Sequence, residues 1–312
     1  MMNANPVVSF CIAAFNRKTD LKRCLDSILE NVKTTYEIIV VDNGSTDGTV
    51  GMLTGEFPNV RVIPLSENIG YAPAVNKAWE ISKGKYLINM SSDAEVMRNT
   101  VEALVSKMEE DACIGIIGPK TFNGKDRFVT TCHSARFISS TLCNVFFVSN
   151  VLRQKFVASV VRMIFSEKTG FTFDYETSRE VPLIDGGVLL IRKTLVNEIG
   201  YLDDRIFLGP DDYDYCLRAR RNGHMIWYEA SAEVIHRTSY KGSLALGHNY
   251  INRVFPITCY FVGKHYGRCS FFFCKVLLSM ALFLRGVLSI LFKFDVVLSR
   301  CYFRSGLSCL VS

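Results

Sequence analysis

Acidic residues and one histidine stand at positions where the chain could do polar chemistry on a bound ligand. Asp42 follows an apolar run and opens into the polar stretch NGSTDG, and Asp93 follows another apolar run through two serines. His236 ends a third such run. Upstream of it, three carboxylates fall within four residues, which is unfavourable unless the side chains are solvated or share a cation or a proton. These three are Asp211, Asp212 and Asp214.

Taken one by one, these residues have ordinary structural explanations. Asp42 could form an Asx turn, Asp93 could cap a helix, and His236 could be a hydrogen-bonded core histidine. Together they fit another chemistry, because oxygen ligands suit Mg²⁺ or Mn²⁺ bridging a diphosphate and imidazole suits Mn²⁺. A further carboxylate can take the proton of an attacking hydroxyl. The combination predicts sugar transfer from a nucleoside diphosphate sugar, with one Asp holding the metal and another acting as base.

The first 120 or so residues contain the elements that would position these groups. Short runs rich in Val and Ile alternate with amphipathic stretches, which is typical of successive β-α units around a parallel sheet. Asp42 and Asp93 follow two of these strands, at the sheet edge where ligands bind in open α/β folds. A later strand at 181–193 carries Gly186 and Gly187, a pair that permits close backbone approach. The expected earlier strands are 7–14, 37–43, 60–65, 85–90 and 113–118.

Six segments, taken in order, resemble the family-two inverting glycosyltransferases of GT-A fold. The match spans roughly residues 7–240 and is closest to the bacterial branch that builds O-antigen, lipopolysaccharide and other surface polysaccharides, including rhamnosyltransferases. The resemblance implies an α/β, Rossmann-like fold with a mixed, mainly parallel sheet and flanking helices. It also implies inverting transfer of a hexose or deoxyhexose to a glycan acceptor. The segments are VSFCIAAFNR, VVDNGSTDGT, NIGYAPAVNKAW, INMSSDAEV, DGGVLLIRK and GPDDYDYCLRARRNGHMIWYEASAEVIH.

The resemblance also implies roles for single residues. Asp212 matches the family's base, Asp211 takes the place of the usual Glu, and Asp214 matches the trailing Asp. Asp93 falls at the metal-diphosphate site, and His236 falls where relatives place a histidine that can complete coordination of Mg²⁺ or Mn²⁺. The nucleotide-sugar donor is expected to contact Ala14, Asn16, Arg17, Asp42, Asn68, Gly70, Asn76, Ser91 and Asp93.

The metal position departs from the family pattern. Many members carry two carboxylates there, whereas this chain reads Ser91, Ser92, Asp93 and keeps only one. Two alternatives follow: a divalent cation bound with weaker affinity, or one held mainly by the diphosphate and His236. Asn68 and Asn76 have an alternative explanation as turn and helix-capping residues.

The basic excess of the chain lies in its last segment. The net charge is +6, and residues 264–312 carry seven Lys and Arg against one acid, Asp295. The apolar runs between these cations are shorter than the roughly 20 residues of a membrane span. An amphipathic helical tail lying on anionic lipid is expected instead; the alternative is a core or dimer-forming helix. On a helical wheel, one side gathers Lys275, Ser279, Arg285, Gly286, Ser289 and Lys293.

These patterns predict a glycosyltransferase domain over 1–245 with a basic helical insert on the acceptor side at about 127–180, and a membrane-associating tail over 246–312. Eleven scattered cysteines without a CxxC pair fit reduced thiols, and no secretory signal is expected. We expect a cytoplasmic protein, peripheral on the cytoplasmic face of the inner membrane, that acts on a lipid-linked acceptor. Nucleic-acid binding is disfavoured because the basic segments are apolar.

Two other functions share parts of this pattern. A nucleotidyltransferase has a strand-end Asp too, but it should carry a Gly-rich loop with Lys or Arg after the first strand, and the sequence AAFN lacks one. A non-catalytic nucleotide- or carbohydrate-binding protein of the same fold would have lost the acidic cluster, which is present here.

Overall fold

The computed structural model divides the chain into two compact units. The first is built from residues 1–133 and 174–239, and the second contains the two C-terminal helices. The predicted insert at about 127–180 lies mostly outside the described residues; its described ends form the short strands β7 (Phe128–Val129), β8 (Cys132–His133) and β9 (Arg179–Glu180). The structure describes residues 5–125, 127–133, 174–207, 209–237, 248–293 and 296–311.

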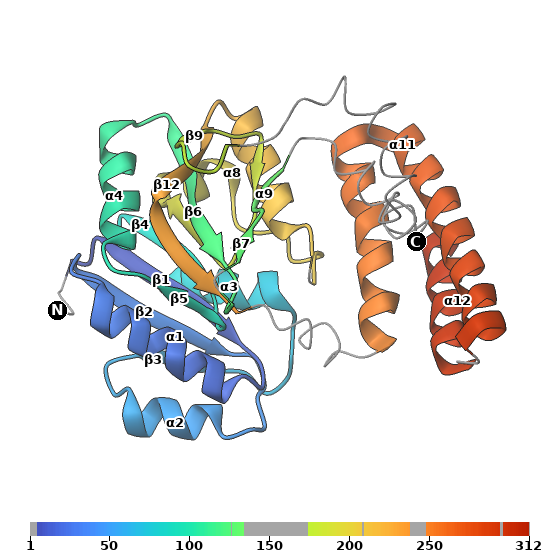
Figure 1. Cartoon of the computed structure of the whole chain (residues 1–312), viewed down its shortest axis with the longest axis horizontal. Coiled ribbons are helices and arrows are strands. Elements are labelled where there is room, and N and C mark those ends of the chain that lie inside the picture. Colours follow the sequence, from blue (N-terminus) through green and yellow to red (C-terminus); the bar gives the residue numbers. More distant parts are fainter. Residues whose placement is uncertain are drawn as a thin grey trace. The chain divides into compact units, whose positions relative to one another are not determined.

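A large mixed sheet forms the centre of the first unit (Figure 1). Its main strand order is β3-β2-β1-β4-β11-β6-β12-β5. The strands β1 to β4 are parallel, β11 runs antiparallel to β4 and β6, and β12 is parallel to β6. The mainly parallel α/β fold predicted from the sequence is confirmed. The bounds are β1 Val8–Ala14, β2 Tyr36–Asp42, β3 Arg61–Pro64, β4 Tyr86–Ser91, β5 Ala94–Val96, β6 Ile114–Phe122, β11 Val188–Arg192 and β12 Met225–His236.

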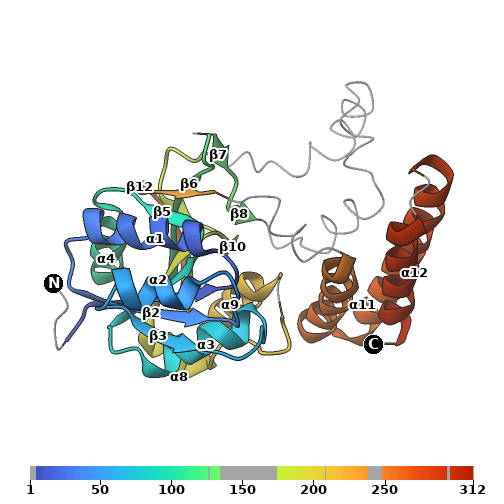
Figure 2. The same ribbon diagram turned by 90° about the horizontal axis from the view of Figure 1, so that it is seen from below.

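Helices cover both faces of this sheet, with α1 and α4 on one side and α3 and α8 on the other (Figure 2). The central strands are buried on both faces, which explains why they read as continuous Val and Ile runs rather than as alternating patterns. Leu25 of α1 and Leu104 of α4 pack into the same core as Phe10 of β1 and Ile38 of β2. The helix bounds are α1 Lys18–Asn31, α2 Thr49–Glu56, α3 Tyr71–Ile81, α4 Thr100–Glu110, α8 Lys193–Ile199 and α9 Asp211–Arg221.

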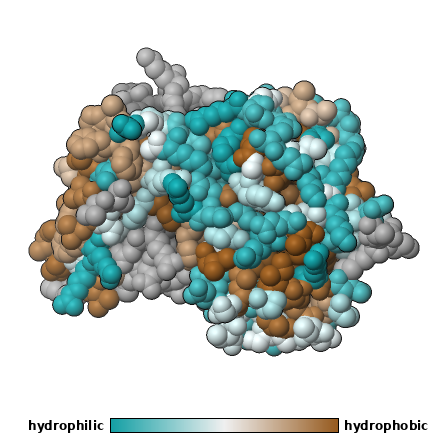
Figure 3. All heavy atoms as spheres, turned by 180° about the vertical axis from the view of Figure 1, so that it is seen from behind, coloured by the Kyte–Doolittle hydropathy of each residue, from teal (hydrophilic) through white to brown (hydrophobic). Residues whose placement is uncertain are grey.

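The second unit contains α11 (His248–Lys293) and α12 (Val296–Val311). Gly267 interrupts α11 with φ 86° and ψ 174°, and beyond this turn Phe271 packs against Gly263. The segment Phe255–Leu291 is long and apolar enough to cross a membrane, and an 18-residue window within it has a mean hydropathy of 2.0. Length and composition alone do not separate such a span from a core helix. Apolar side chains gather on the surface of this unit, seen at the left of Figure 3.

One expectation about this tail is wrong. The wheel side that contains Ser279, Gly286 and Ser289 was expected to face lipid headgroups, but these three residues are buried. Ser279 Oγ donates to the carbonyl oxygen of Gly306 in α12 at 2.9 Å. Gly286 lies so close to Phe303 that a Cβ there would come within 2.6 Å of the ring. Small residues on this side let the two helices approach, so the side packs against protein.

Candidate active site

Asp42 ends β2 at the carboxyl edge of the sheet, opposite Ala14 at the end of β1. Its side chain is almost fully buried, and Oδ2 accepts a hydrogen bond from the backbone N–H of Ser45 at 3.2 Å. Its Oδ1 is buried and has no hydrogen-bond partner within the described part of the chain. A buried carboxylate oxygen without a partner is costly, so Asp42 is suited to accept a hydrogen bond from a ligand.

Two loops join at this edge to frame Asp42. Ala14 accepts a hydrogen bond from the Asn43 N–H at 2.7 Å. Asn16 has a positive φ of 51°, donates its N–H to Ser45 Oγ at 2.9 Å, and accepts the Thr46 N–H on Oδ1 at 2.8 Å. The predicted donor loop after β1 and the polar turn after β2 therefore form one surface.

Asn68 and Gly70 belong to a third loop at the same edge. Asn43 Nδ2 donates to Asn68 Oδ1 at 3.1 Å and to the Gly70 carbonyl at 2.9 Å. Gly70 has φ 104°, and a Cβ there would lie 2.7 Å from the Phe207 ring, so only glycine fits. Asn68 Oδ1 also accepts the Gly70 N–H at 3.0 Å, which is the turn-shaping role weighed as its alternative.

Asn76 is buried in α3 and fixes the loop that precedes α9. Its Nδ2 donates to the Leu202 carbonyl at 2.9 Å and to Asp204 Oδ1 at 2.5 Å, while its Oδ1 accepts the Leu202 N–H at 3.0 Å. These bonds satisfy both ends of the amide within the chain. The arrangement favours the structural alternative for Asn76, and its donor-binding role stays a prediction.

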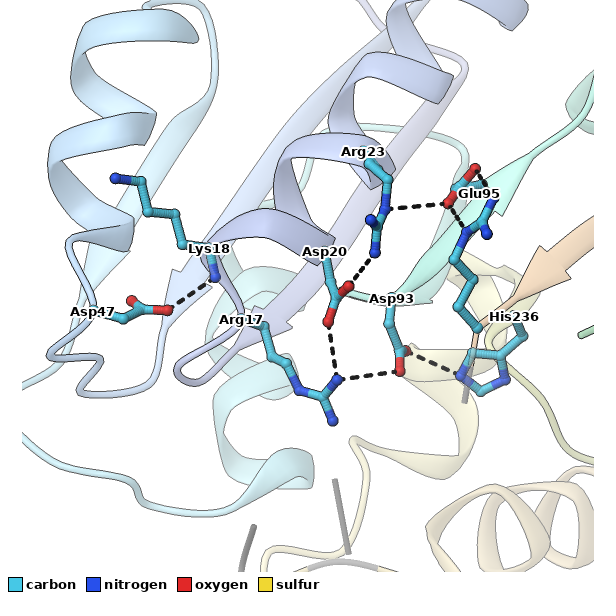
Figure 4. Close-up of polar contacts among 9 residues, drawn as sticks. Arg17, Lys18, Asp20, Arg23, Asp47, Asp93, Glu95 and His236 are labelled. Atoms are coloured by element: carbon cyan, nitrogen blue, oxygen red, sulfur yellow. Dashed lines mark hydrogen bonds and ion pairs between the residues drawn. The ribbon is translucent and has the colours of Figure 1, made fainter. Parts of the chain in front are cut away.

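Asp93 and His236 meet at the opposite side of this edge (Figure 4). They lie 3.1 Å apart, between Asp93 Oδ1 and His236 Nε2. The antiparallel pairing of β5 with β12 places His236 opposite Ala94, which brings the histidine beside Asp93. Arg17 Nη1 lies 3.9 Å from Asp93 Oδ2. Burial alone would raise the pKa of Asp93, but the hydrogen bond with His236 and the charges of His236 and Arg17 outweigh it and lower the pKa.

Gly187 makes this pairing possible. A Cβ at Gly187 would come within 2.7 Å of His236 Cγ, so the imidazole lies directly on the glycine backbone. The Gly187 carbonyl accepts the N–H of Ser91, the last residue of β4, at 2.7 Å. The close backbone approach predicted for the glycine pair is confirmed.

Asp212 lies in the first turn of α9, is partly buried, and is hydrogen-bonded to the backbone of Gly186. Burial raises the pKa of its carboxyl well above the ordinary value, and the negative charges of Asp211 and Asp185 raise it further. Burial also raises the pKa of Asp211 to about 7, with contributions from the charges of Asp214 and Asp185. Asp212 thus contacts one residue of the glycine pair while His236 lies on the other.

The third carboxylate of the acidic cluster has a different environment. Asp214 is completely buried and pairs with Arg218 Nε at 2.8 Å. Arg218 also donates to the carbonyl oxygens of Ile199 and Tyr201, at 2.7 and 2.8 Å. Asp214 therefore ties α9 to the loop after α8 through Arg218, which is a structural task.

Tyr71 connects the two halves of the site and was missed in the sequence. Its hydroxyl donates to Asn89 Oδ1 at 3.0 Å. Burial raises the pKa of Tyr71 well above its ordinary value, and the charges of Asp212, Asp211 and Asp93 all act on it in the same direction. One phenol thus lies within electrostatic reach of both Asp93 and Asp212. The apolar spacing of α3 could not reveal this, because it marks Tyr71 only as a helix start.

A divalent cation would find few protein ligands here. In the ranges that the structure describes, no group of three or more His, Cys, Asp or Glu side chains is arranged to hold a metal ion. Asp93 and His236 offer one carboxylate and one imidazole side by side, a donor pair that suits Mn²⁺. The residues fit a cation that takes its other ligands from a bound diphosphate, as the single carboxylate in the sequence indicated.

Glycosyltransferases of bacteria are similar to this chain in sequence. The N-acetylglucosaminyl-diphospho-decaprenol L-rhamnosyltransferase of Mycobacterium tuberculosis is 25% identical to this chain over 257 residues. The match covers 77% of this chain and 78% of the relative. An uncharacterized glycosyltransferase of Escherichia coli K12, YibD, is 32% identical over 114 residues, covering 36% of this chain and 33% of the relative.

Solved structures share the fold at low sequence identity. S. aureus TarS (residues 1–349) in complex with UDP-GlcNAc has a TM-score of 0.57 at 16% identity, covering 97% of this chain and 79% of that one. A mannosyltransferase from Pyrobaculum calidifontis in complex with GDP-Man and Mn²⁺ has a TM-score of 0.55 at 16% identity, covering 99% and 88%. The model of glycosyl transferase family 2 matches residues 9–200. The chain therefore belongs to glycosyl transferase family 2 and is a glycosyltransferase of the GT-A fold.

Proposed function

We propose that this enzyme transfers a hexose or deoxyhexose from a nucleoside diphosphate sugar to a lipid-linked glycan acceptor, with inversion at the anomeric carbon, in the assembly of a surface polysaccharide such as O-antigen. Two observations on the same groups carry the proposal. The charges of Asp93 and Asp212 both act on Tyr71. His236, which is paired with Asp93, lies on Gly187, and Asp212 is hydrogen-bonded to Gly186. The name of the mycobacterial relative, a rhamnosyltransferase for a diphospho-decaprenol acceptor, supports a deoxyhexose and a lipid diphosphate acceptor.

The donor nucleoside is proposed to bind at Asp42. Its unpartnered Oδ1 would accept a hydrogen bond from a base N–H or a ribose hydroxyl. The loop from Ala14 to Arg17 would line the same side, with the Arg17 guanidinium toward the diphosphate, because Arg17 already points at Asp93. UDP-sugar and GDP-sugar complexes of proteins with this fold support the donor class.

A divalent cation, Mg²⁺ or Mn²⁺, is proposed at Asp93 and His236. When bound, it would neutralise the charge that develops on the departing diphosphate. Arg17 contributes a second positive charge from the other side of Asp93. Mn²⁺ in the Pyrobaculum mannosyltransferase complex supports a cation in this fold.

Asp212 is proposed as the base. The acceptor hydroxyl oxygen forms a bond to the anomeric carbon while the bond from that carbon to the diphosphate oxygen breaks. The hydroxyl proton passes to the Asp212 carboxylate, and the nucleoside diphosphate leaves. A single displacement of this kind inverts the anomeric configuration. The raised pKa of Asp212 suits this role, since a carboxylate with a higher pKa is a stronger proton acceptor once it is ionised.

A lipid-linked acceptor places the reaction at a membrane. We propose the cytoplasmic face of the inner membrane, with the basic tail toward anionic lipid. Ten cysteines of the described residues are free thiols, which supports a reducing compartment.

The test is a donor panel with Mg²⁺ or Mn²⁺ that measures nucleoside diphosphate release and transfer to a polyprenyl-diphosphate N-acetylglucosamine. Asp212→Asn should fold and bind donor as wild type does and lose transfer by at least about a hundredfold. Asp26→Asn, which changes a half-exposed carboxylate on α1, is the control and should keep full activity. Wild-type turnover by Asp212→Asn would remove the base assignment, and transfer from none of the donors would contradict the proposed function.

A further inference from the structure

The segment 268–293 of α11 has an exposed face that is entirely apolar. From residue 272 to residue 291, every exposed side chain belongs to a large hydrophobic residue, with exposed fractions between 42% and 63%. At about 100° per residue, these side chains occupy about one third of the helix circumference. A helix that faces water carries polar residues on such a face. We call this set the apolar arc: Phe272, Phe273, Met280, Leu284, Val287, Ile290 and Leu291.

The opposite side of the same segment is already covered by protein. Leu278 and Leu282 are completely buried there, next to Ser279 and Gly286. In addition to the hydrogen bond from Ser279, Ser299 Oγ of α12 donates to the carbonyl oxygen of Gly286 at 2.9 Å. Close packing through Gly and Ser with hydroxyl-to-carbonyl bonds is common between helices in lipid. The apolar arc therefore takes no part in the packing of α11 against α12.

The charged residues that the structure describes near the apolar arc are positive and lie outside it. Lys275 and Arg285 pack on the rings of Phe271 and Tyr302, with the cation 4.8 and 5.9 Å from the ring centroids. Arg300 and Arg304 are exposed on α12. Residues 264–312 carry seven Lys and Arg against the single acid Asp295. An apolar face accompanied by such an excess of cations fits an anionic lipid surface rather than a protein surface of mixed charge.

We propose that the segment 268–293 lies in the plane of an anionic bilayer surface, with the apolar arc among the acyl chains and α12 covering its opposite side. A transverse arrangement is disfavoured because Arg300 and Arg304, near the middle of α12, would then face hydrocarbon. The inference rests on the proposed membrane location of the acceptor and extends it by naming the residues that enter the lipid. Its test needs no sugar transfer, so the two proposals fail separately.

The test is flotation of the full chain with vesicles of phosphatidylethanolamine and phosphatidylglycerol. Wild type should float at low salt and at high salt, since apolar contact is not screened. The double variant Met280→Gln/Leu284→Gln should lower the partition coefficient about tenfold at both salt concentrations. The matched control Leu29→Gln/Met97→Gln changes the same residue types at exposed positions of the first unit and should bind as wild type does. Thermal unfolding reports folding of each variant, so this control is independent of the proposed reaction.

Three results would overturn the proposal. The first is release of wild type from vesicles by high salt, which would reduce the contact to charge attraction. The second is an equal loss of binding in the control variant. The third is a stable dimer that ignores vesicles and is broken by Met280→Gln/Leu284→Gln, because a second copy would then cover the arc.

Orientation is tested with an impermeant maleimide added outside the vesicles. Cys301 of α12, which is half-buried, should react as the exposed Cys113 of the first unit does, because α12 covers the side of the segment that faces away from lipid. Protection of Cys301 while Cys113 reacts would place α12 in hydrocarbon and contradict the in-plane arrangement.

Discussion

Gly187 lies directly beneath the ring of His236, so that an added Cβ would come within 2.7 Å of the imidazole Cγ. The contact fixes where the Nε2 atom meets Asp93, because the ring has a flat backbone on one side and the carboxylate at its edge. From the sequence, Gly187 is expected only to permit close backbone approach. In the structure it sets the position of His236, the proposed metal ligand.

Gly187→Ala tests this relationship. The methyl group must displace a ring held between β11 and β12, so we expect a loss of about 1–3 kcal/mol of unfolding free energy and weaker activation by Mn²⁺. The measurements are thermal unfolding and a Mn²⁺ titration of activity. Gly51→Ala is the control, because nothing lies within 4 Å of the added methyl group in α2, and it should keep or raise stability. An unchanged Mn²⁺ response in Gly187→Ala would argue against His236 as a ligand.

Asp42→Asn should separate binding from stability. The unpartnered Oδ1 contributes no hydrogen bond to the described fold, so removing the buried charge should leave Tm unchanged or raise it. Nucleotide affinity should fall about tenfold or more, as expected for loss of a charged hydrogen bond. Calorimetric titration with UDP and GDP measures this, with the exposed Glu67→Gln as control. Unchanged affinity for every nucleotide would remove Asp42 from the donor site.

Asp214→Asn should behave in the opposite way to Asp212→Asn. Asp214 is fully buried and pairs with Arg218, so we expect a loss of about 3 kcal/mol of unfolding free energy. Chemical denaturation of both variants checks the contrast. A destabilised Asp212→Asn beside an unaffected Asp214→Asn would reverse the roles that the structure gives these carboxylates.

The raised pKa of Asp211 makes stability depend on pH. A carboxyl whose pKa is about 7 in the folded chain and about 4 in the unfolded chain keeps its proton on folding, so the free energy of unfolding falls as the pH rises between these values. Asp211→Asn removes this effect. It should stabilise the protein by on the order of 2 kcal/mol at about pH 8, and give no gain near pH 4. Thermal unfolding at both pH values provides the measurement.

The same variant should alter the pH profile of transfer. Asp212 must be ionised to accept a proton, so the rate should fall as the pH drops through its raised pKa. The charge of Asp211 helps to raise that pKa, and Asp211→Asn should therefore move the acid limb of kcat to lower pH. If the acid limb of the kcat profile is unchanged in Asp211→Asn, a group other than Asp212 controls this limb.

The sequence predicted the sheet, because strand ends and their polar residues are local signals, whereas the placement of His236 near Asp93 followed from the family resemblance. It did not reveal Tyr71, since the charges that act on this phenol come from segments far along the chain. The helical wheel of the tail separated small from large residues correctly, but a wheel does not say which side is covered. The side with Ser279 and Gly286 turned out to face α12.

The reversed direction of β11 has a wider consequence. Since this strand runs against β4, the residues that begin β11 and the residues that end β4 arrive at one rim, while the interiors of both strands stay buried. Reactive groups therefore gather at the ends of strands and helices, beside loops whose replacement leaves the hydrophobic framework intact. Such an arrangement lets a lineage exchange one sugar or acceptor for another through loop substitutions, without having to re-evolve a folded core.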